Sequence, residues 1–260
     1  MVARKSGWKE ISFENGVYTV ELLSWNYFSD YISQELLNYS TYVYRGHADY
    51  KWKLEPTIDR ILKNSEDKLR QVHLENFKLS TRGRRGPNPA NLNSENDWWA
   101  LGQHHGLKTP LLDWTESPFV ALFFAAINGV KEKSKYITVF CLSQHSVEKY
   151  NKLYARNGEK KLSCEIFRPM SDENSRLVSQ RGLFSKTPNN IDLESWIKKY
   201  YTPEPEHEVT YELIKINIPR RELESCLKYL NRMNINPSTL FPDLYGSSKH
   251  CNLELDISGY

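Results

Sequence analysis

Residues 98–125 read WWALGQHHGLKTPLLDWTESPFVALFFA, and this stretch decides how the fold is interpreted. Two Trp residues, two adjacent His residues and a carboxylate stand here beside the most apolar run of the chain. Polar groups next to a core must be hydrogen-bonded there or used there. We therefore expect a functional site in this region.

The first part of the stretch predicts a helix. Ser94 is a good N-cap, and Gly106 suits the left-handed residue that ends a helix. Gln103, His104 and His105 then lie at the end of this helix, where the last backbone carbonyls accept hydrogen bonds.

The second part predicts an extended segment followed by a buried helix. Residues 107–114 are too short and too interrupted by proline for a helix, so we expect them to be extended. Pro118 suits the first turn of the next helix, which Thr115 or Ser117 would cap. That helix is apolar on every side, which indicates burial all round. Asp113, Trp114 and Thr115 are thereby predicted at a strand-to-helix junction, which holds side chains rigidly.

Composition bounds the class of protein. The 260 residues suffice for one large domain, and a net charge of +3 is too balanced to require a nucleic-acid partner. The four Cys residues are far apart and form no metal-binding pair, so we expect reduced thiols and no metal. No apolar leader or run of about 18 apolar residues is present, so we expect a cytoplasmic protein without membrane contact.

Outward from the central stretch, helices and strands mix without strict alternation. This favours a single α+β domain with a mixed or antiparallel sheet and flanking helices. The expected elements are a helix capped by Ser24, a strand at 41–44, a charged helix at 59–80, a loop at 81–94, strands at 136–142 and 208–218, and a helix opened by Pro219 and running to Met233.

The chain resembles the FRG domain family, named for a Phe/Tyr-Arg-Gly motif. The matching pieces are Tyr44-Arg45-Gly46, Gln103-His104-His105-Gly106-Leu107, residues 111–118 with 121–125, Arg176 with 179–184, and residues 239–244. The resemblance implies an N-terminal helical lead-in at 1–40, an FRG domain at 41–250 and a tail at 251–260. One departure is that Lys108-Thr109-Pro110 stands where the family usually reads Pro-Thr-Arg.

More distantly, the chain is similar to ADP-ribosyltransferases of the arginine-serine-glutamate class. Their first motif is a strand ending in Tyr-Arg, matched by Tyr44-Arg45-Gly46, and their second is a Ser/Thr turn entering a helix, matched by 113–117. Their third is a Glu at the head of a strand, for which Gln180, Glu206 and Glu208 are candidates. The resemblance implies a cleft of that type with NAD as substrate, bound by Tyr44, Arg45, Gly46, Asp113, Trp114 and Thr115.

Each role has a chemical reason. A guanidinium can fork onto a phosphate, and Gly46 would let the backbone approach the ligand. Cleavage of the nicotinamide–ribose bond passes through an oxocarbenium-like state, which an acceptor near the 2-hydroxyl stabilises. Gln180 could only hydrogen-bond that hydroxyl, whereas Glu206 or Glu208 could also compensate charge. His104 or His105 could orient a sugar or take a proton.

Structural roles compete with each of these functional ones. Arg45 could pair with Asp113, one His could cap a helix C-terminus, and Asp113 could cap the buried helix. The Trp residues could be core residues, and the Glu candidates could lie on a solvated edge.

Two functions remain open. The first is an NAD-consuming ADP-ribosyltransferase-like enzyme, of toxin or phage-defence effector type, acting on a protein or nucleic acid. Its catalytic candidates are Gln180, Glu208, His104 and His105. The second is a non-catalytic FRG module that binds a nucleotide or nucleic acid. The first predicts that residues 43–46, 113–117 and 180–184 converge on one cleft.

Overall fold

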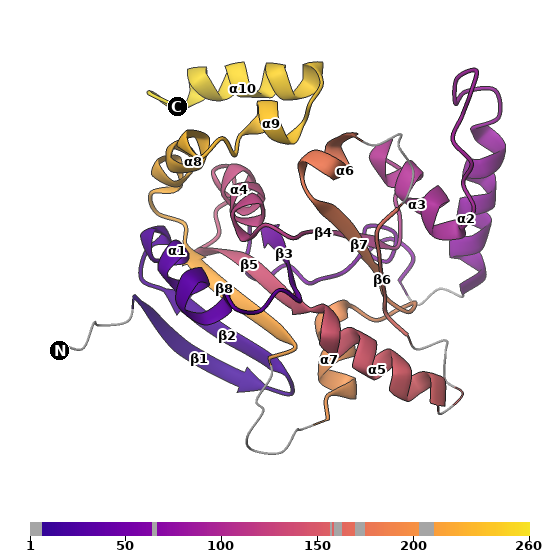
Figure 1. Ribbon diagram of the computed structural model, residues 1–260, viewed down its shortest axis with the longest axis horizontal. Helices are drawn as coiled ribbons and strands as arrows, with labels where there is room; N and C mark the ends of the chain where they lie inside the picture. Colours follow the sequence, from indigo (N-terminus) through magenta and orange to yellow (C-terminus); the bar gives the residue numbers. More distant parts are fainter. Residues whose placement is uncertain (1–6, 64–66, 157, 159–162, 170–174, 203–210) are drawn as a thin grey trace.

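One twisted sheet organises the molecule. The computed structural model describes residues 7–63, 67–156, 158, 163–169, 175–202 and 211–260. Within them the eight strands follow the order β1-β2-β8-β5-β3-β4-β7-β6 (Figure 1). The strands are β1 Trp8–Glu14, β2 Val17–Leu22, β3 Tyr42–His47, β4 Leu111–Thr115, β5 Tyr136–Ser143, β6 Glu165–Phe167, β7 Gly182–Lys186 and β8 Leu213–Pro219. Only the β2–β8 pairing is parallel, so the sheet is mixed.

Helices cover both faces of this sheet, which confirms the α+β fold class. They are η1 Trp25–Tyr27, α1 Phe28–Tyr31, η2 Ile32–Leu36, α2 Asp67–Ser80, α3 Glu95–His104, α4 Pro118–Gly129, α5 Gln144–Arg156, α6 Ser175–Ser179, α7 Leu193–Tyr200, α8 Leu223–Arg232, α9 Pro237–Leu240 and α10 Leu244–Asp256. None of the helices in the described ranges is long and apolar enough to cross a membrane.

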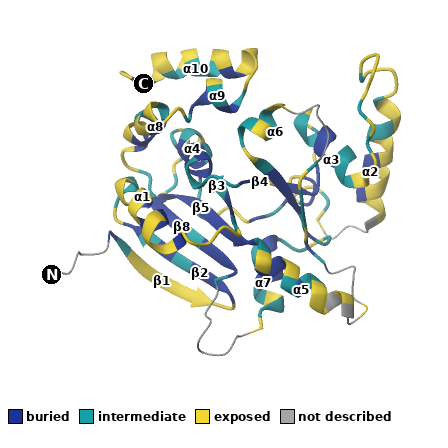
Figure 2. Ribbon diagram, viewed as in Figure 1, coloured by how far each residue is buried: buried dark blue, intermediate teal, exposed yellow. Residues whose placement is uncertain are grey.

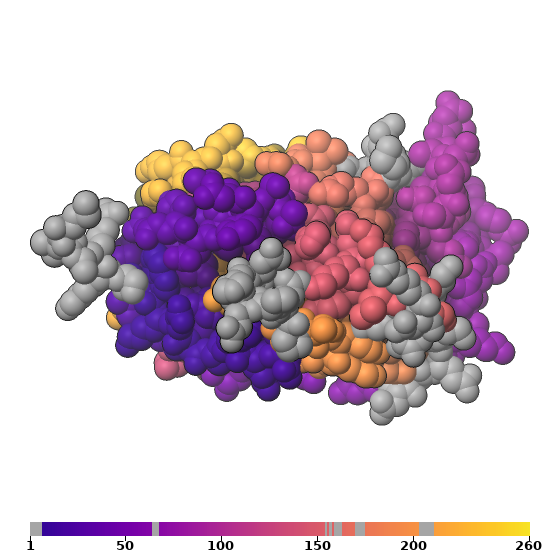
Figure 3. Space-filling model, turned by 60° about the horizontal axis from the view of Figure 1, so that its bottom comes forward, coloured from indigo at the N-terminus to yellow at the C-terminus, as the bar shows by residue number. Residues whose placement is uncertain are grey.

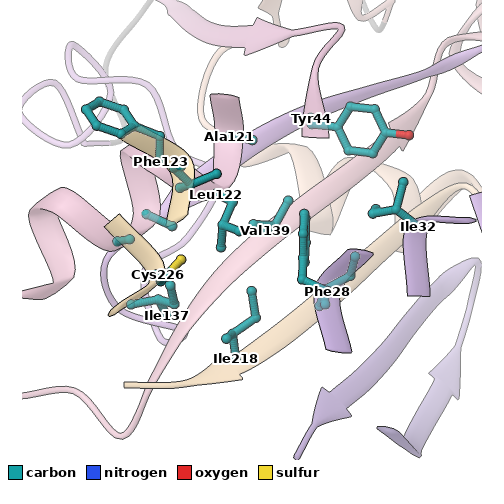
Figure 4. Packing of buried hydrophobic residues seen from close by; sticks show 14 of the residues in the cluster. Phe28, Ile32, Tyr44, Ala121, Leu122, Phe123, Ile137, Val139, Ile218 and Cys226 are labelled. Carbon is teal, nitrogen blue, oxygen red and sulfur yellow. The ribbon is translucent and has the colours of Figure 1, made fainter. Parts of the chain in front are cut away.

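The largest core lies between the sheet and α4. Ala121 and Phe123 of α4 are fully buried in one cluster with Val139 of β5 and with residues from α1, β2, β8 and α8 (Figure 4). Strand β5 is buried along its whole length, because α4 covers one of its faces and other helices the opposite face. This double burial explains why its sequence is mostly apolar. The strand is coloured as buried, dark blue, in Figure 2.

A second core fills the opposite face. Trp196 of α7 and Tyr150 of α5 pack there against Phe140 and against Trp114 of β4. A third cluster joins α2 and α3 to the β4–β7 end of the sheet through Leu74, Trp99 and neighbouring residues. Helix α2 stands at this end of the molecule in Figure 1, and Figure 3 shows the same segment projecting there.

The central stretch folds as its capping signals predict. Ser94 and Asp97 form a capping box on α3, and Gly106 has a φ of +86°. Ser117, rather than Thr115, caps α4 by accepting a hydrogen bond from the Val120 amide. The sequence therefore predicted the position of α4 and most of its burial, but the helix is not buried all round, since Phe119, Phe124 and Ile127 are half-buried.

Several expectations outside that stretch differ from the structure, including the charged helix expected at 59–80, of which α2 is Asp67–Ser80. Residues 8–22 form the β1–β2 hairpin rather than part of a helical lead-in, and only the segment after Ser24 is helical. Pro219 ends β8 instead of opening a helix, since α8 begins at Leu223. Helix α10 continues to Asp256, so the predicted tail at 251–260 begins within a helix.

Candidate functional site

The sheet opens between β3 and β4. Along β3 six residues pair with β5, but only Tyr44 pairs with β4, opposite Thr115. Beyond this pair the strands separate, and the Arg45 side chain donates from Nη1 to the Asp113 carbonyl oxygen at 2.7 Å. The guanidinium thus bridges the two strands where the backbone ladder stops.

A pocket of about 370 Å³ lies at this opening, within the size range of small-molecule sites. All three segments that the sequence predicted to converge contribute to it. It is lined by Tyr44, Arg45, Gly46, Gln103, His104, Asp113, Trp114, Thr115, Ala121, Phe124, Asn128, Arg176, Leu177, Gln180, Phe184 and Phe241.

Arg45 is held by protein groups. Its Nε donates to His47 Nε2 at 3.0 Å, and its Nη1 lies 3.5 Å from Asp113 Oδ2. Burial lowers the pKa of Arg45, and the Asp113 carboxylate opposes that shift. The Nη2 atom has no hydrogen-bond partner within the described part of the chain. The structural pairing with Asp113 is therefore present, and one nitrogen remains for a ligand.

His47 is a site residue that sequence reasoning missed. Burial, followed by the nearby Arg45 charge, lowers the pKa of His47 to about 3, so the imidazole is neutral and its Nε2 accepts from Arg45. The signal was available, since residues two apart on a strand share a face. His47 fixes the plane in which the guanidinium lies.

Gln103 orients the carboxylate of Asp113. Its Nε2 donates to Asp113 Oδ1 at 2.7 Å, and its Oε1 accepts from the buried Thr109 hydroxyl. The side chain of Asp113 is 64% exposed, yet it is held from one side by Gln103 and from the other by Arg45. Asp113 does not cap α4, because Ser117 does so. The sequence predicted Gln103 at the end of a helix and within a family motif, without a partner for its side chain.

The two imidazoles separate in role. His104 lines the pocket, whereas His105 is exposed and is not among the lining residues. Burial lowers the pKa of His104, His105 and Arg176 lower it further, and Asp243 opposes them. Only His104 is placed to contact a ligand in the pocket.

Gln180 closes the opposite side of the pocket. Its backbone carbonyl accepts from Thr115 Oγ1 at 2.6 Å, and its Nε2 donates to the Leu240 carbonyl at 3.0 Å. These bonds fix Gln180 and leave its Oε1 without a hydrogen-bond partner among the described residues. Trp114 contributes to the pocket wall but is 3% exposed, and its Nε1 donates to Ser185 Oγ, so it is mainly a core residue.

Gly46 has a different role from the expected one. A Cβ at this position would lie 2.0 Å from the Ala121 carbonyl oxygen and 2.6 Å from the Ala125 amide nitrogen of α4. The glycine is therefore required for the close approach of α4 to β3, and it also lines the pocket.

The remaining third-motif candidates, Glu206 and Glu208, lie outside the described residues. Among the described lining residues, Asp113 is the only carboxylate. In the same part of the chain, no group of three or more His, Cys, Asp or Glu side chains is arranged to hold a metal ion.

Residues 40–134 match the family model described as FRG domain, which confirms the family resemblance for that part of the chain. The match includes β3, α3, β4 and α4, whereas Arg176, Gln180 and Phe241 lie beyond it. The searches of curated proteins and of solved structures gave no match.

Proposed function

We propose that the pocket binds NAD and that the protein is an ADP-ribosyltransferase-like enzyme, acting as an effector of toxin or antiviral-defence type on a protein or nucleic acid. The observation that carries this proposal is the meeting of Arg45, Asp113 and Gln180 in one pocket where the sheet opens. At about 370 Å³ the pocket is small for a dinucleotide, so one half of the substrate would lie inside and the rest along the rim.

The residues divide the work as follows. The Nη2 of Arg45, for which the described residues provide no partner, would donate to a phosphate oxygen. Gln180 would accept a hydrogen bond from a ribose hydroxyl through its Oε1. His104, whose pKa is lowered by burial, would be neutral at pH 7 and able to take a proton from the acceptor.

Asp113 would supply the charge compensation. Cleavage breaks the bond between the ribose carbon and the nicotinamide nitrogen, and the electron pair leaves with nicotinamide, which becomes neutral. The ribose acquires positive charge until a lone pair of the acceptor forms the new bond. A carboxylate that Gln103 already orients needs no rearrangement to stabilise that charge.

The test is release of nicotinamide from NAD labelled in its nicotinamide ring, with and without cell lysate as a source of acceptor. Asp113→Asn keeps an oxygen for Gln103 and removes the charge, so turnover should fall about 100-fold or more while NAD affinity stays within a few-fold. The matched control is Glu116→Gln, because Glu116 pairs with Arg168 and Arg181 and does not line the pocket.

A binding module without transfer activity is the second candidate. The observation favouring it is that the one carboxylate of the described lining, Asp113, is already engaged by Arg45 and Gln103. Binding of NAD or ADP-ribose by wild-type protein without nicotinamide release in lysate would select this candidate. Absence of both binding and release would reject the NAD proposal.

A further inference from the structure

An ion pair spans the pocket wall between α6 and the start of α10. Arg176 donates from Nε at 2.8 Å and from Nη2 at 2.5 Å, both to Oδ2 of Asp243. The other carboxylate oxygen, Oδ1, accepts from the Gly246 amide at 3.0 Å and so caps α10. Each oxygen of Asp243 therefore has a separate task.

Aromatic rings hold the Arg176 guanidinium independently of Asp243. Its central carbon lies 5.3 Å from the ring centre of Phe241 and 5.2 Å from that of Tyr245. Both distances are within the range of cation–π attraction. The guanidinium would keep its position if the carboxylate were replaced by another anion.

The pair is also weak enough to exchange. The side chains of Arg176 and Asp243 are 29% and 39% exposed, and pairs exposed to this degree contribute little to stability. Arg176 lines the pocket with His104, and its Nη1 has no hydrogen-bond partner within the described ranges. A second guanidinium thus borders the same cavity as Arg45.

From these contacts we propose that Arg176 is a phosphate-binding residue, and that a phosphate group of the ligand replaces Asp243 on its guanidinium. A phosphate offers more acceptor oxygens than the single carboxylate oxygen now used, and the fork of Arg176 suits it. The inference rests on the proposed function in that the ligand carries a pyrophosphate. It predicts that ligand binding competes with the contact between α6 and α10.

Titration calorimetry with inorganic pyrophosphate and with ADP-ribose tests this directly. Asp243→Asn keeps an oxygen to cap α10 and releases Arg176, so both probes should bind about three- to fivefold tighter. Arg176→Gln should weaken binding about tenfold or more. Glu14→Gln removes a carboxylate of a comparable ion pair, with Lys198 outside the pocket, and should leave both affinities unchanged.

The double variant separates exchange at Arg176 from a general loss of negative charge. If Asp243→Asn acts by freeing Arg176, it should give no gain on the Arg176→Gln background. An equal gain on both backgrounds, or no gain on either, overturns the inference.

Comparing probe binding by the variants with nicotinamide release by the wild-type protein keeps this inference distinct from the proposed enzyme activity. If Asp243→Asn binds the probes more tightly but the wild-type protein releases no nicotinamide, the phosphate site is supported and the transferase is rejected. If the wild-type protein releases nicotinamide but neither variant changes the probe affinities, the transferase is supported and the phosphate site is rejected. Wild-type protein that binds neither probe overturns the phosphate site.

Discussion

Replacing Gly46 by alanine tests whether the close packing of α4 against β3, beside the pocket, requires this glycine. The strand β3 and the helix α4 approach so closely that the new Cβ would lie 2.0 Å from the Ala121 carbonyl oxygen. Ordinary contact begins at 3.4 Å, so α4 would have to retreat by about 1.4 Å. The obstructing atoms, the Ala121 carbonyl group and the Ala125 amide nitrogen, belong to the helix backbone, so no side-chain rotation relieves the clash.

The expected cost follows from the place of α4 in the core. Its retreat would loosen the packing of Ala121, Phe123 and Ala125, which are all fully buried. Overpacking a core costs typically 1–3 kcal/mol, and a backbone clash on a central helix should cost at least about 3 kcal/mol. A loss of that size is a large fraction of the roughly 5–15 kcal/mol that stabilises an ordinary domain.

Urea unfolding followed by tryptophan fluorescence measures this cost without any ligand. The matched control is Gly106→Ala, because a Cβ there meets no atom within 4 Å and strains only a backbone at φ +86°. That variant should lose about 1–2 kcal/mol. If Gly46→Ala loses no more than Gly106→Ala, the close approach of α4 does not require this glycine.

Five further substitutions probe the same region. Phe123→Ala should cost about 3–5 kcal/mol in urea unfolding, since Phe123 is fully buried, and Phe124→Ala should cost less because that ring borders the pocket; equal costs would contradict this. Thr109→Val should cost about 1–3 kcal/mol by leaving Gln103 without its donor, and no measurable loss would refute that role. The pKa of His47 in the folded protein, about 3, lies below its value in the unfolded chain. The stability that His47 contributes is therefore complete above about pH 6.5 and falls by up to roughly 1.4 kcal/mol per pH unit toward pH 3. Between pH 7.5 and pH 5.5, the urea unfolding midpoint should decline less for His47→Asn than for the wild-type protein. Arg45→Ala should cost more than 1 kcal/mol even without ligand, because the side chain bridges β3 and β4, and a smaller loss would show that the bridge is dispensable.

The elements that the sequence predicted well carry their own boundary signals. Helix α3 begins at a capping box, and α4 begins at Ser117 followed by proline. The β1–β2 hairpin also has a local sequence signal, because Asn15-Gly16 is a dipeptide typical of tight hairpin turns. Both residues adopt positive φ in the turn that joins the strands. The hairpin turn is therefore encoded locally, whereas the pairing of β2 with β8 depends on residues about 200 positions apart.

The site was predictable in its residues and not in its connections. The sequence identified three polar groups at motif positions, Arg45, Asp113 and Gln180. It did not predict the residues that hold their side chains in place. Gln180, for example, is held by the carbonyl of Leu240, 60 positions away. Such contacts depend on how strands and helices assemble, because local propensity does not specify which elements become neighbours.

The structural role of Arg45 is compatible with the ligand-binding role proposed for it. His47 and the Asp113 carbonyl occupy Nε and Nη1, which fixes the guanidinium and, among the described residues, leaves Nη2 without a partner. His47 is neutral, and the Asp113 carboxylate is 3.5 Å away and 64% exposed, so the positive charge of Arg45 is only partly compensated. A charge held rigidly before the ligand arrives requires little ordering on binding. Loss of stability in Arg45→Ala therefore does not argue against a ligand role, and the affinity for pyrophosphate is the measurement that reports on it.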